Sequence, residues 1–235
     1  MRKDKVSIFV PTRSGSERVK NKNTKVFAGV KGGILSIKLK QLLDIQGIED
    51  IILSTNDEES ILVAERFGDS KIKIIRRPDF LCKSNTKVSE LINYVANLIE
   101  NKHIFWIHAT APFVETQDYE KALDLYLKNY KYDDTYSLAS VSKIQQFLWD
   151  NEEKRMINHE VENGNWPRTQ DLKPIYEINH AFYINSKENY IKYNNRVSPN
   201  MDIFELNRIK QIDIDWEDDF LLAEQIYKYL VLNSK

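Results

Sequence analysis

Short apolar runs alternate along the chain with longer segments in which apolar residues recur every three or four positions. Several of the short runs are apolar at consecutive positions, which is typical of parallel strands that are buried on both faces. The first part of the chain contains five predicted strands of this kind: Lys5–Val10, Asp50–Ser54, Lys71–Ile75, His103–His108 and Tyr136–Val141.

The longer segments have the spacing of amphipathic helices. They are Asp57–Phe67, Thr86–Glu100 and Glu115–Asn129, and each lies between two predicted strands. Strands and helices in alternation predict an α/β fold, with a mostly parallel, Rossmann-like sheet covered by helices on both faces. Ligands of such sheets bind beyond the carboxyl ends of the strands.

This alternation is interrupted between residues 142 and 176, a segment with two tryptophans and many charged residues. We predict a hairpin-like lobe that protrudes from a single domain covering residues 1–235. The remaining predicted elements are strands at Ile178–Ile184 and Arg208–Ile214 and helices at Ser186–Tyr193 and Trp216–Val231.

Composition narrows the class of protein. Among 235 residues, 34 Lys and Arg are balanced by 35 Asp and Glu, so the net charge of −1 argues against a nucleic-acid partner. Cys82 is the only cysteine and cannot form an internal disulfide, which favours the cytoplasm. We expect no signal peptide and no membrane-spanning segment, because no apolar stretch is long enough.

One loop is strongly cationic despite this balance. Val10–Asn23, VPTRSGSERVKNKN, directly follows the first predicted strand. Small residues around Gly15 allow close backbone approach to an anion, while Arg13 and Lys22 supply positive charge, so the loop can wrap a polyphosphate. The loop matches neither the Walker pattern nor the dinucleotide-binding glycine pattern, so an NAD-dependent oxidoreductase is disfavoured. The alternative is a loop of solvated cations.

An acidic pair lies near the other end of the chain, in the segment Ile212–Glu224, IDIDWEDDFLLAE. In a strand, Asp213 and Asp215 would point to the same side. Two carboxylates can hold Mg²⁺ when substrate phosphates supply the remaining ligands. The alternative is that Asp215 caps the final helix and Asp213 is solvated.

The opening motif Pro11-x-Arg13-x-Gly15-Ser16-x-Arg18, followed by Lys22-Asn23, resembles that of the acylneuraminate cytidylyltransferases, the CMP-sialic acid synthetases. The Ile-Asp-Ile-Asp segment is similar to the closing motif of that family. The resemblance implies that Arg13, Ser16, Lys22 and Asn23 contact CTP, and that the aspartate pair binds the metal.

Three further segments follow in the order of the family. Arg76–Thr86 resembles a cytidine-binding stretch, with Arg77 and Ser84 retained. Ile107–Val114 resembles a loop in which His108 takes the place of a sugar contact, although His108 could equally be a hydrogen-bonded core histidine. Trp166–Ile184 resembles the sugar-binding run, and the residues implied there are Arg168 for the sugar carboxylate, with Gln170 and Asn179 for polar contacts.

The resemblance implies a CTP-dependent cytidylyltransferase that converts an acidic sugar of the nonulosonic type into its CMP-sugar and releases pyrophosphate. It also implies a homodimer formed through the lobe, with Arg168 or its neighbours serving the partner's site. Glu177 and His180 depart from the family pattern, which leaves open a different acidic or phosphorylated acceptor. A catalytically silent homologue that binds nucleotide is the other alternative.

Overall fold

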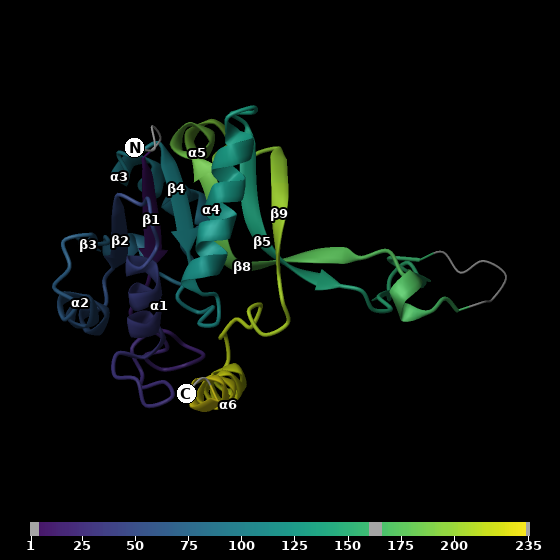
Figure 1. The fold of residues 1–235 in the computed structure, drawn as a ribbon, viewed down its shortest axis with the longest axis horizontal. Helices are drawn as coiled ribbons and strands as arrows, with labels where there is room; N and C mark the ends of the chain where they lie inside the picture. The colour runs from purple at the N-terminus through teal and green to yellow at the C-terminus, as the bar shows by residue number, and fades with distance from the viewer. Residues whose placement is uncertain (1–4, 160–165, 234–235) are drawn as a thin grey trace.

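The computed structural model describes residues 5–159 and 166–233 (Figure 1). These residues contain a seven-stranded sheet in the order β3-β2-β1-β4-β8-β5-β9, in which β8 runs antiparallel to both neighbours and the other pairs are parallel. The strands are β1 Val6–Pro11, β2 Asp50–Thr55, β3 Ile72–Arg76, β4 His103–Ile107, β5 Tyr136–Ile144, β8 Ile175–Ser186 and β9 Asn200–Leu206. The prediction of an α/β fold with a mostly parallel sheet is confirmed.

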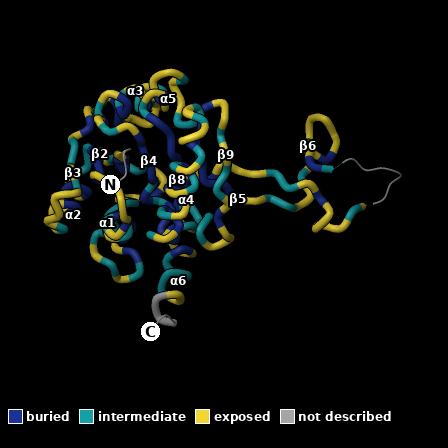
Figure 2. The backbone as a smooth tube through the Cα atoms, turned by 45° about the horizontal axis from the view of Figure 1, so that its top comes forward, coloured by how far each residue is buried: buried dark blue, intermediate teal, exposed yellow. Residues whose placement is uncertain are grey.

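Helices cover both faces of this sheet, because alternate residues of the central strands point into two separate cores. Ile8 and Val10 of β1 pack on one side with α1 Gly33–Leu43, α2 Glu58–Glu65 and α4 Thr116–Tyr130. On the opposite side, Phe9 of β1 packs with α3 Val88–Leu98 and α5 Lys187–Tyr193. Figure 2 shows the central strands as the buried part of the tube, with the outer sides of the helices exposed.

Helix α1 was not among the predicted elements, although its apolar residues Ile34, Leu35, Leu39 and Leu42 have helical spacing. It begins at Gly33, where the backbone has a φ of 61°. A Cβ at this position would lie 2.2 Å from the carbonyl oxygen of Lys25. The glycine therefore lets the cationic loop pack directly against the start of α1.

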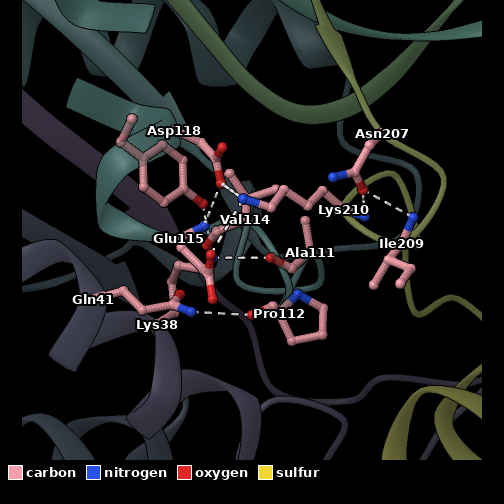
Figure 3. A network of polar contacts seen from close by, with 11 residues as sticks. Lys38, Gln41, Ala111, Pro112, Val114, Glu115, Asp118, Asn207, Ile209 and Lys210 are labelled. Atoms are coloured by element: carbon pink, nitrogen blue, oxygen red, sulfur yellow. Dashed lines mark hydrogen bonds and ion pairs between the residues drawn. The ribbon is translucent and has the colours of Figure 1, made fainter. Parts of the chain in front are cut away.

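The predicted strand Arg208–Ile214 is wrong. Strand β9 ends at Leu206, and the side chain of Asn207 accepts hydrogen bonds from the backbone N–H groups of Ile209 and Lys210, which turns the chain away from the sheet (Figure 3). The edge position beside β5 is taken by β9 instead. Asp213 and Asp215 consequently lie in an extended connection and not on one face of a strand.

That connection leads into α6 Glu217–Asn233, which lies beside the N-terminal loop beneath the sheet in Figure 1. Phe220 of α6 packs in a small third core with Phe27, Ile34 and Phe113. Asp219 accepts hydrogen bonds from the backbone N–H groups of Asp215 and Trp216, so the helix start is capped by its own first turn. The last helix therefore meets the loop that follows the first strand.

Residues between β5 and β8 extend away from the sheet on a two-stranded stem (Figure 1). The described part of this lobe contains a short antiparallel pair, β6 Trp149–Asp150 and β7 Arg155–Met156, and a 3-10 turn, η2 Thr169–Asp171. Trp149 and Trp166 are 57% and 67% exposed, respectively. Within the described ranges, no helix combines the length and apolarity needed to cross a bilayer.

Candidate active site

A cleft of about 740 Å³ lies at the carboxyl ends of β1 and β4. Its walls come from the loop after β1, the segment between β3 and α3 with its 3-10 turn η1 Asp79–Leu81, the first residues after β4, and Trp216 before α6. Seven of the residues expected in the site line this cleft: Arg13, Ser16, Lys22, Asn23, Arg77, Ser84 and His108. The sequence motifs therefore converge on one cavity.

Lys22 joins the two ends of the chain in this cleft. Its Nζ donates hydrogen bonds to the carbonyl oxygen of Ile214 at 2.7 Å and to Oδ1 of Asp215 at 3.0 Å. Arg18 approaches the same carboxylate from the loop, with Nη1 3.1 Å from Oδ2 of Asp215, while its guanidinium lies 5.0 Å from the ring centroid of Trp216. Cationic and acidic groups thus meet on one side of the cleft.

The cationic loop is held in shape by its own backbone and by its neighbours. Asn21 has a positive φ of 53°, and its carbonyl oxygen accepts from the N–H groups of Thr24 and Lys25. The backbone N–H of Ser14 donates to Oδ1 of Asn56, which positions Asn56 as a support of the loop. Nη1 of Arg13 donates to the carbonyl oxygen of Cys82, so the loop is also tied to the opposite wall.

Arg77 is 5% exposed, and only some of its N–H groups have hydrogen-bond partners among the described residues. Its Nη2 donates to the carbonyl oxygen of Thr12 at 2.6 Å, and its Nε lies 3.1 Å from Sγ of Cys82. Its Nη1 has no hydrogen-bond partner within the described residues, although buried polar groups are nearly always paired. Arg77 therefore both fixes the end of β1 and retains a donor at a residue that lines the cleft.

The two carboxylates have different electrostatic environments. Burial raises the pKa of Asp213, and the charge of Asp215 raises it further, against the opposing effect of a hydrogen bond from Thr110. Burial also acts to raise the pKa of Asp215, but its contacts with Lys22 and Arg18 outweigh burial and hold the pKa below its usual value. Within the described chain, no group of three or more His, Cys, Asp or Glu side chains is arranged for a metal ion.

His108 lies beside a large aromatic ring at the end of β4. The indole N–H of Trp106 donates to Nε2 of His108 at 2.9 Å, which requires that nitrogen to be unprotonated and places the proton of the neutral ring on Nδ1. Burial lowers the pKa of His108 to about 3, and the positive charges of Arg196 and Lys22 act in the same direction. His108 is therefore a neutral hydrogen-bonding group.

The loop Ala109–Val114, which carries the wall after β4, is anchored from below by a buried lysine (Figure 3). Nζ of Lys38 donates to the carbonyl oxygens of Ala111 and Val114, each at 2.9 Å, and lies 2.7 Å from the hydroxyl of Tyr119. The carbonyl oxygen of Thr110 then accepts from the N–H of Ile214 at 2.9 Å. Lys38 thus supports the backbone that positions the acidic pair.

Five expected residues are not among those that line this cleft: Asp213, Asp215, Arg168, Gln170 and Asn179. Of these, Asp215 lies next to the cleft through its contacts with Lys22 and Arg18. Asn179 is buried, and its amide is hydrogen-bonded to the hydroxyls of Ser140 and Ser142 in the sheet. Arg168 and Gln170 lie on the lobe, where Arg168 forms an ion pair with Asp171.

The cleft also contains residues that were not anticipated. These residues include Lys83, Lys87, Trp106, Arg196 and Trp216. Lys83 and Lys87 follow the 3-10 turn and add positive charge to the wall opposite the cationic loop. Arg196 lies in the loop between α5 and β9, 88 residues after His108. No motif in the sequence connects these two residues.

An α/β sheet with a cationic loop after its first strand, and an aspartate in contact with that loop, is suited to binding a phosphorylated ligand beyond the carboxyl ends of the strands. Residues 7–234 match the family model described as Cytidylyltransferase, and the chain belongs to this family of nucleotidyltransferases. The resemblance seen in the sequence motifs is thereby confirmed.

Individual relatives agree with this assignment. The chain is 24% identical over 228 residues to the pseudaminic acid cytidylyltransferase of Campylobacter jejuni serotype O:2, covering 94% of this chain and 95% of the relative. It is 23% identical to the N-acylneuraminate cytidylyltransferase of Streptococcus agalactiae serotype III, covering 91% of this chain and 51% of that protein. The structure of a CMP:2-keto-3-deoxy-manno-octonic acid synthetase complexed with CTP shares the fold, with a TM-score of 0.63, 13% identity and coverage of 96% and 99%.

Proposed function

We propose that this protein is a CTP-dependent cytidylyltransferase that activates a nonulosonic acid to its CMP-sugar. The contact that carries this proposal is the one between Lys22 and Asp215, because it joins the cationic loop that lines the cleft to the acidic segment beside it. The relatives named for pseudaminic acid and for N-acylneuraminate support an acidic nine-carbon acceptor.

The anomeric hydroxyl of the sugar acid releases its proton to solvent and attacks the α-phosphorus of CTP. A new P–O bond forms, and the bond from the α-phosphorus to the oxygen that bridges it to the β-phosphorus breaks. Pyrophosphate leaves, so the residues of this chain serve to align the reactants and to offset negative charge. Arg13 and Lys22 would contact the phosphates from the loop after β1, together with Ser16 and Asn23. Arg77 and Ser84 line the opposite wall, where the cytidine would bind.

Asp213 and Asp215 fit a site for Mg²⁺. Both supply carboxylate oxygens, which Mg²⁺ prefers as ligands. Burial is the main cause of the raised pKa of Asp213, and the nearby charge of Asp215 adds to it. When bound, Mg²⁺ would polarise the phosphate oxygens and stabilise the leaving pyrophosphate. Lys22 already neutralises part of this acidic charge, so it would hold Asp215 in place before the metal and nucleotide arrive.

We further propose that the active form is a homodimer in the cytoplasm. Exposed aromatic residues of the lobe, including Phe147 and the two tryptophans, are typical of an interface core. In a dimer, the lobe would bring Arg168 and Gln170 to the cleft of the partner subunit. The single cysteine, Cys82, is buried and unpaired, as a reducing compartment favours.

The direct test is incubation with CTP, Mg²⁺ and a panel of sugar acids while pyrophosphate is measured. The panel contains N-acetylneuraminic, pseudaminic and legionaminic acids, with the eight-carbon 2-keto-3-deoxy-manno-octonic acid as a comparison. We expect release with at least one nine-carbon acid. Absence of release with every acid would contradict the proposal, and calorimetric CTP binding without turnover would then favour a silent homologue.

One feature keeps a different acidic or phosphorylated acceptor as the second candidate. His180 has a positive φ of 59°, and its ring is hydrogen-bonded to the hydroxyl of Tyr183, so this departure from the family pattern is built into the backbone. A sugar phosphate in the same assay distinguishes the two candidates.

A further inference from the structure

Arg196 occupies an unusual position on the wall of the cleft. It comes from the loop between α5 and β9, and its guanidinium lies 4.2 Å from the ring centroid of Tyr183 and 5.4 Å from that of Trp106. Trp106 and Tyr183 are paired residues of β4 and β8, so both rings stand on the rigid sheet. Cation–π contacts of this kind hold the guanidinium over the two rings, and its N–H groups can still donate hydrogen bonds.

No carboxylate of the described residues forms an ion pair with this side chain. By contrast, Arg18, Arg76 and Arg168 are each paired with an Asp or Glu. A partly exposed guanidinium that packs on aromatic rings and has no carboxylate partner can offer its N–H donors to an anionic ligand. The aromatic platform and the absent partner together point to an anion.

The neighbouring groups favour the same kind of ligand. His108 is held neutral with its proton on Nδ1, because Trp106 donates to Nε2. Burial, and then the charge of Arg196, also lowers the pKa of His180, so neither histidine competes as a second cation. This side of the cleft therefore has one cationic group, the guanidinium of Arg196, beside the neutral ring of His108.

We propose that Arg196 binds the carboxylate of the acidic sugar, which makes it a specificity-determining residue supplied by the same chain as the cleft. The inference rests on the proposed cytidylyltransferase function. A guanidinium can pair bidentately with a planar carboxylate, and the rings of Trp106 and Tyr183 restrain Arg196 at the wall of the cleft. Arg13 and Lys22, which are proposed to contact the phosphates of CTP, belong to the loop after β1, whereas Arg196 comes from the loop between α5 and β9.

This assignment competes with the one made from the sequence, in which Arg168 holds the carboxylate. Arg168 is 73% exposed, paired with Asp171 and located on the lobe, and it is not among the residues that line the cleft. Arg196 lines the cleft of its own chain. The roles of Arg168 and Arg196 can therefore be distinguished by measuring variants of each residue with the same pair of substrates.

The experiment measures kcat and KM for the sugar acid that the wild-type protein uses best and for its 1-carboxamide, which lacks the charge. The variants are Arg196→Met, Arg196→Lys and Arg168→Met, with Arg66→Met as the control because Arg66 is exposed at the end of α2. KM for CTP and the thermal midpoint are measured for each variant as checks of the nucleotide site and of folding.

We expect Arg196→Met to raise KM for the sugar acid by about 10- to 100-fold, the range for loss of hydrogen bonds to a charged group. KM of Arg196→Lys for the sugar acid should lie between the values of Arg196→Met and the wild type, because lysine keeps the positive charge but cannot form the bidentate hydrogen bonds. KM for CTP should change by no more than about twofold. The preference of the wild type for the acid over the carboxamide should largely disappear in Arg196→Met and persist in Arg66→Met.

An Arg196→Met protein that folds, turns over CTP and still prefers the acid as strongly as the wild type would overturn the inference and leave the proposed function intact. Loss of that preference in Arg168→Met alone would show that Arg168, and not Arg196, binds the carboxylate. A wild-type protein that releases no pyrophosphate with any sugar acid would overturn both. If Arg196→Met does not fold, the two substrates are compared with Arg196→Lys instead. A KM for the sugar acid and a preference for the acid that both equal those of the wild type would then contradict a bidentate contact.

Discussion

At the scale of single residues, Lys22 has the most demanding position. Its side chain is only 13% exposed, and it contacts both the backbone and the carboxylate of the segment before α6. A methionine has similar length but cannot donate, so Asp215 would lose its main cationic partner. Lys22 therefore links the charge of the loop to the geometry of the acidic pair.

We expect Lys22→Met to lower kcat/KM for CTP by about 100-fold or more, which is the usual effect of removing one group that stabilises transition-state charge. The matched control is Lys20→Met, since Lys20 is exposed in the same loop and does not line the cleft. Steady-state pyrophosphate release measures both. Equal activity of the two variants would show that Lys22 acts only as a structural tether.

Residues of the site differ in how far the sequence predicted them. Arg13 and Lys22 were identified because they follow an apolar strand within a compact motif. Arg196 gave no such signal, because its position depends on the rings of two strands that are distant in sequence. Asn179 was assigned to the sugar from motif order, yet its amide is engaged by serines of the neighbouring strand, and its role in binding stays a prediction.

At the scale of elements, the loop after β4 depends on a lysine of α1. Lys38 is completely buried and donates to two backbone carbonyls of the loop. Burial lowers the pKa of Lys38 from 10.5 to about 7, with Asp118 and Glu115 opposing this effect. The neutral amine can still donate two hydrogen bonds and accept one from Tyr119.

The sign of the resulting pH dependence follows from linkage. Between pH 7 and 10.5 the unfolded chain retains the proton of Lys38 while the folded chain releases it, so the free energy of unfolding rises with pH in this window. We expect the stability difference between wild type and Lys38→Met to grow as pH rises from 7 to 10, at up to about 1.4 kcal/mol per pH unit.

Urea unfolding at several pH values measures this difference. Lys40→Met, an exposed position on the same helix, should show no such growth. A difference that stays constant with pH would mean that Lys38 keeps an ordinary pKa in the folded protein.

Among elements, the sequence predicted those with a clear local pattern, such as the consecutive apolar residues of β4 and the helical spacing of α4. It failed at Arg208–Ile214, where an alternating run was read as a strand although Asn207 had already turned the chain. A local pattern cannot show whether a sheet edge is free, and here β9 occupies it. The helix at Gly33–Leu43 was missed although its spacing was regular.

At the scale of the whole molecule, the lobe determines what the proposed homodimer can do. The rings of Phe147 and Trp166 contact each other with centroids 5.1 Å apart, and together with Trp149 they leave apolar surface exposed on the lobe. A monomer would carry this surface in water, whereas a dimer would bury it. Assembly and acceptor binding would then depend on the same segment.

We expect the double variant Trp149→Ser, Trp166→Ser to shift the mass in solution from twice 27.7 kDa to 27.7 kDa. Sugar-dependent turnover should fall, while CTP affinity stays within about threefold, because the nucleotide wall belongs to one chain. Light scattering and calorimetry provide the measurements. Tyr132→Ser, at a position 87% exposed outside the lobe, serves as the control, and a monomeric wild type would contradict the homodimer.

The two-stranded stem of the lobe has one more consequence. Ile144 of β5 and Ile175 of β8 are direct register partners, so the excursion leaves and re-enters the sheet at a single cross-strand pair. We expect that residues can be inserted or exchanged beyond that pair without changing the register of the core strands. The segment could then be replaced as a unit. Chimeras that carry the corresponding stretch of a homologue should fold, and acceptor preference could then diversify without any redesign of the nucleotide-binding scaffold.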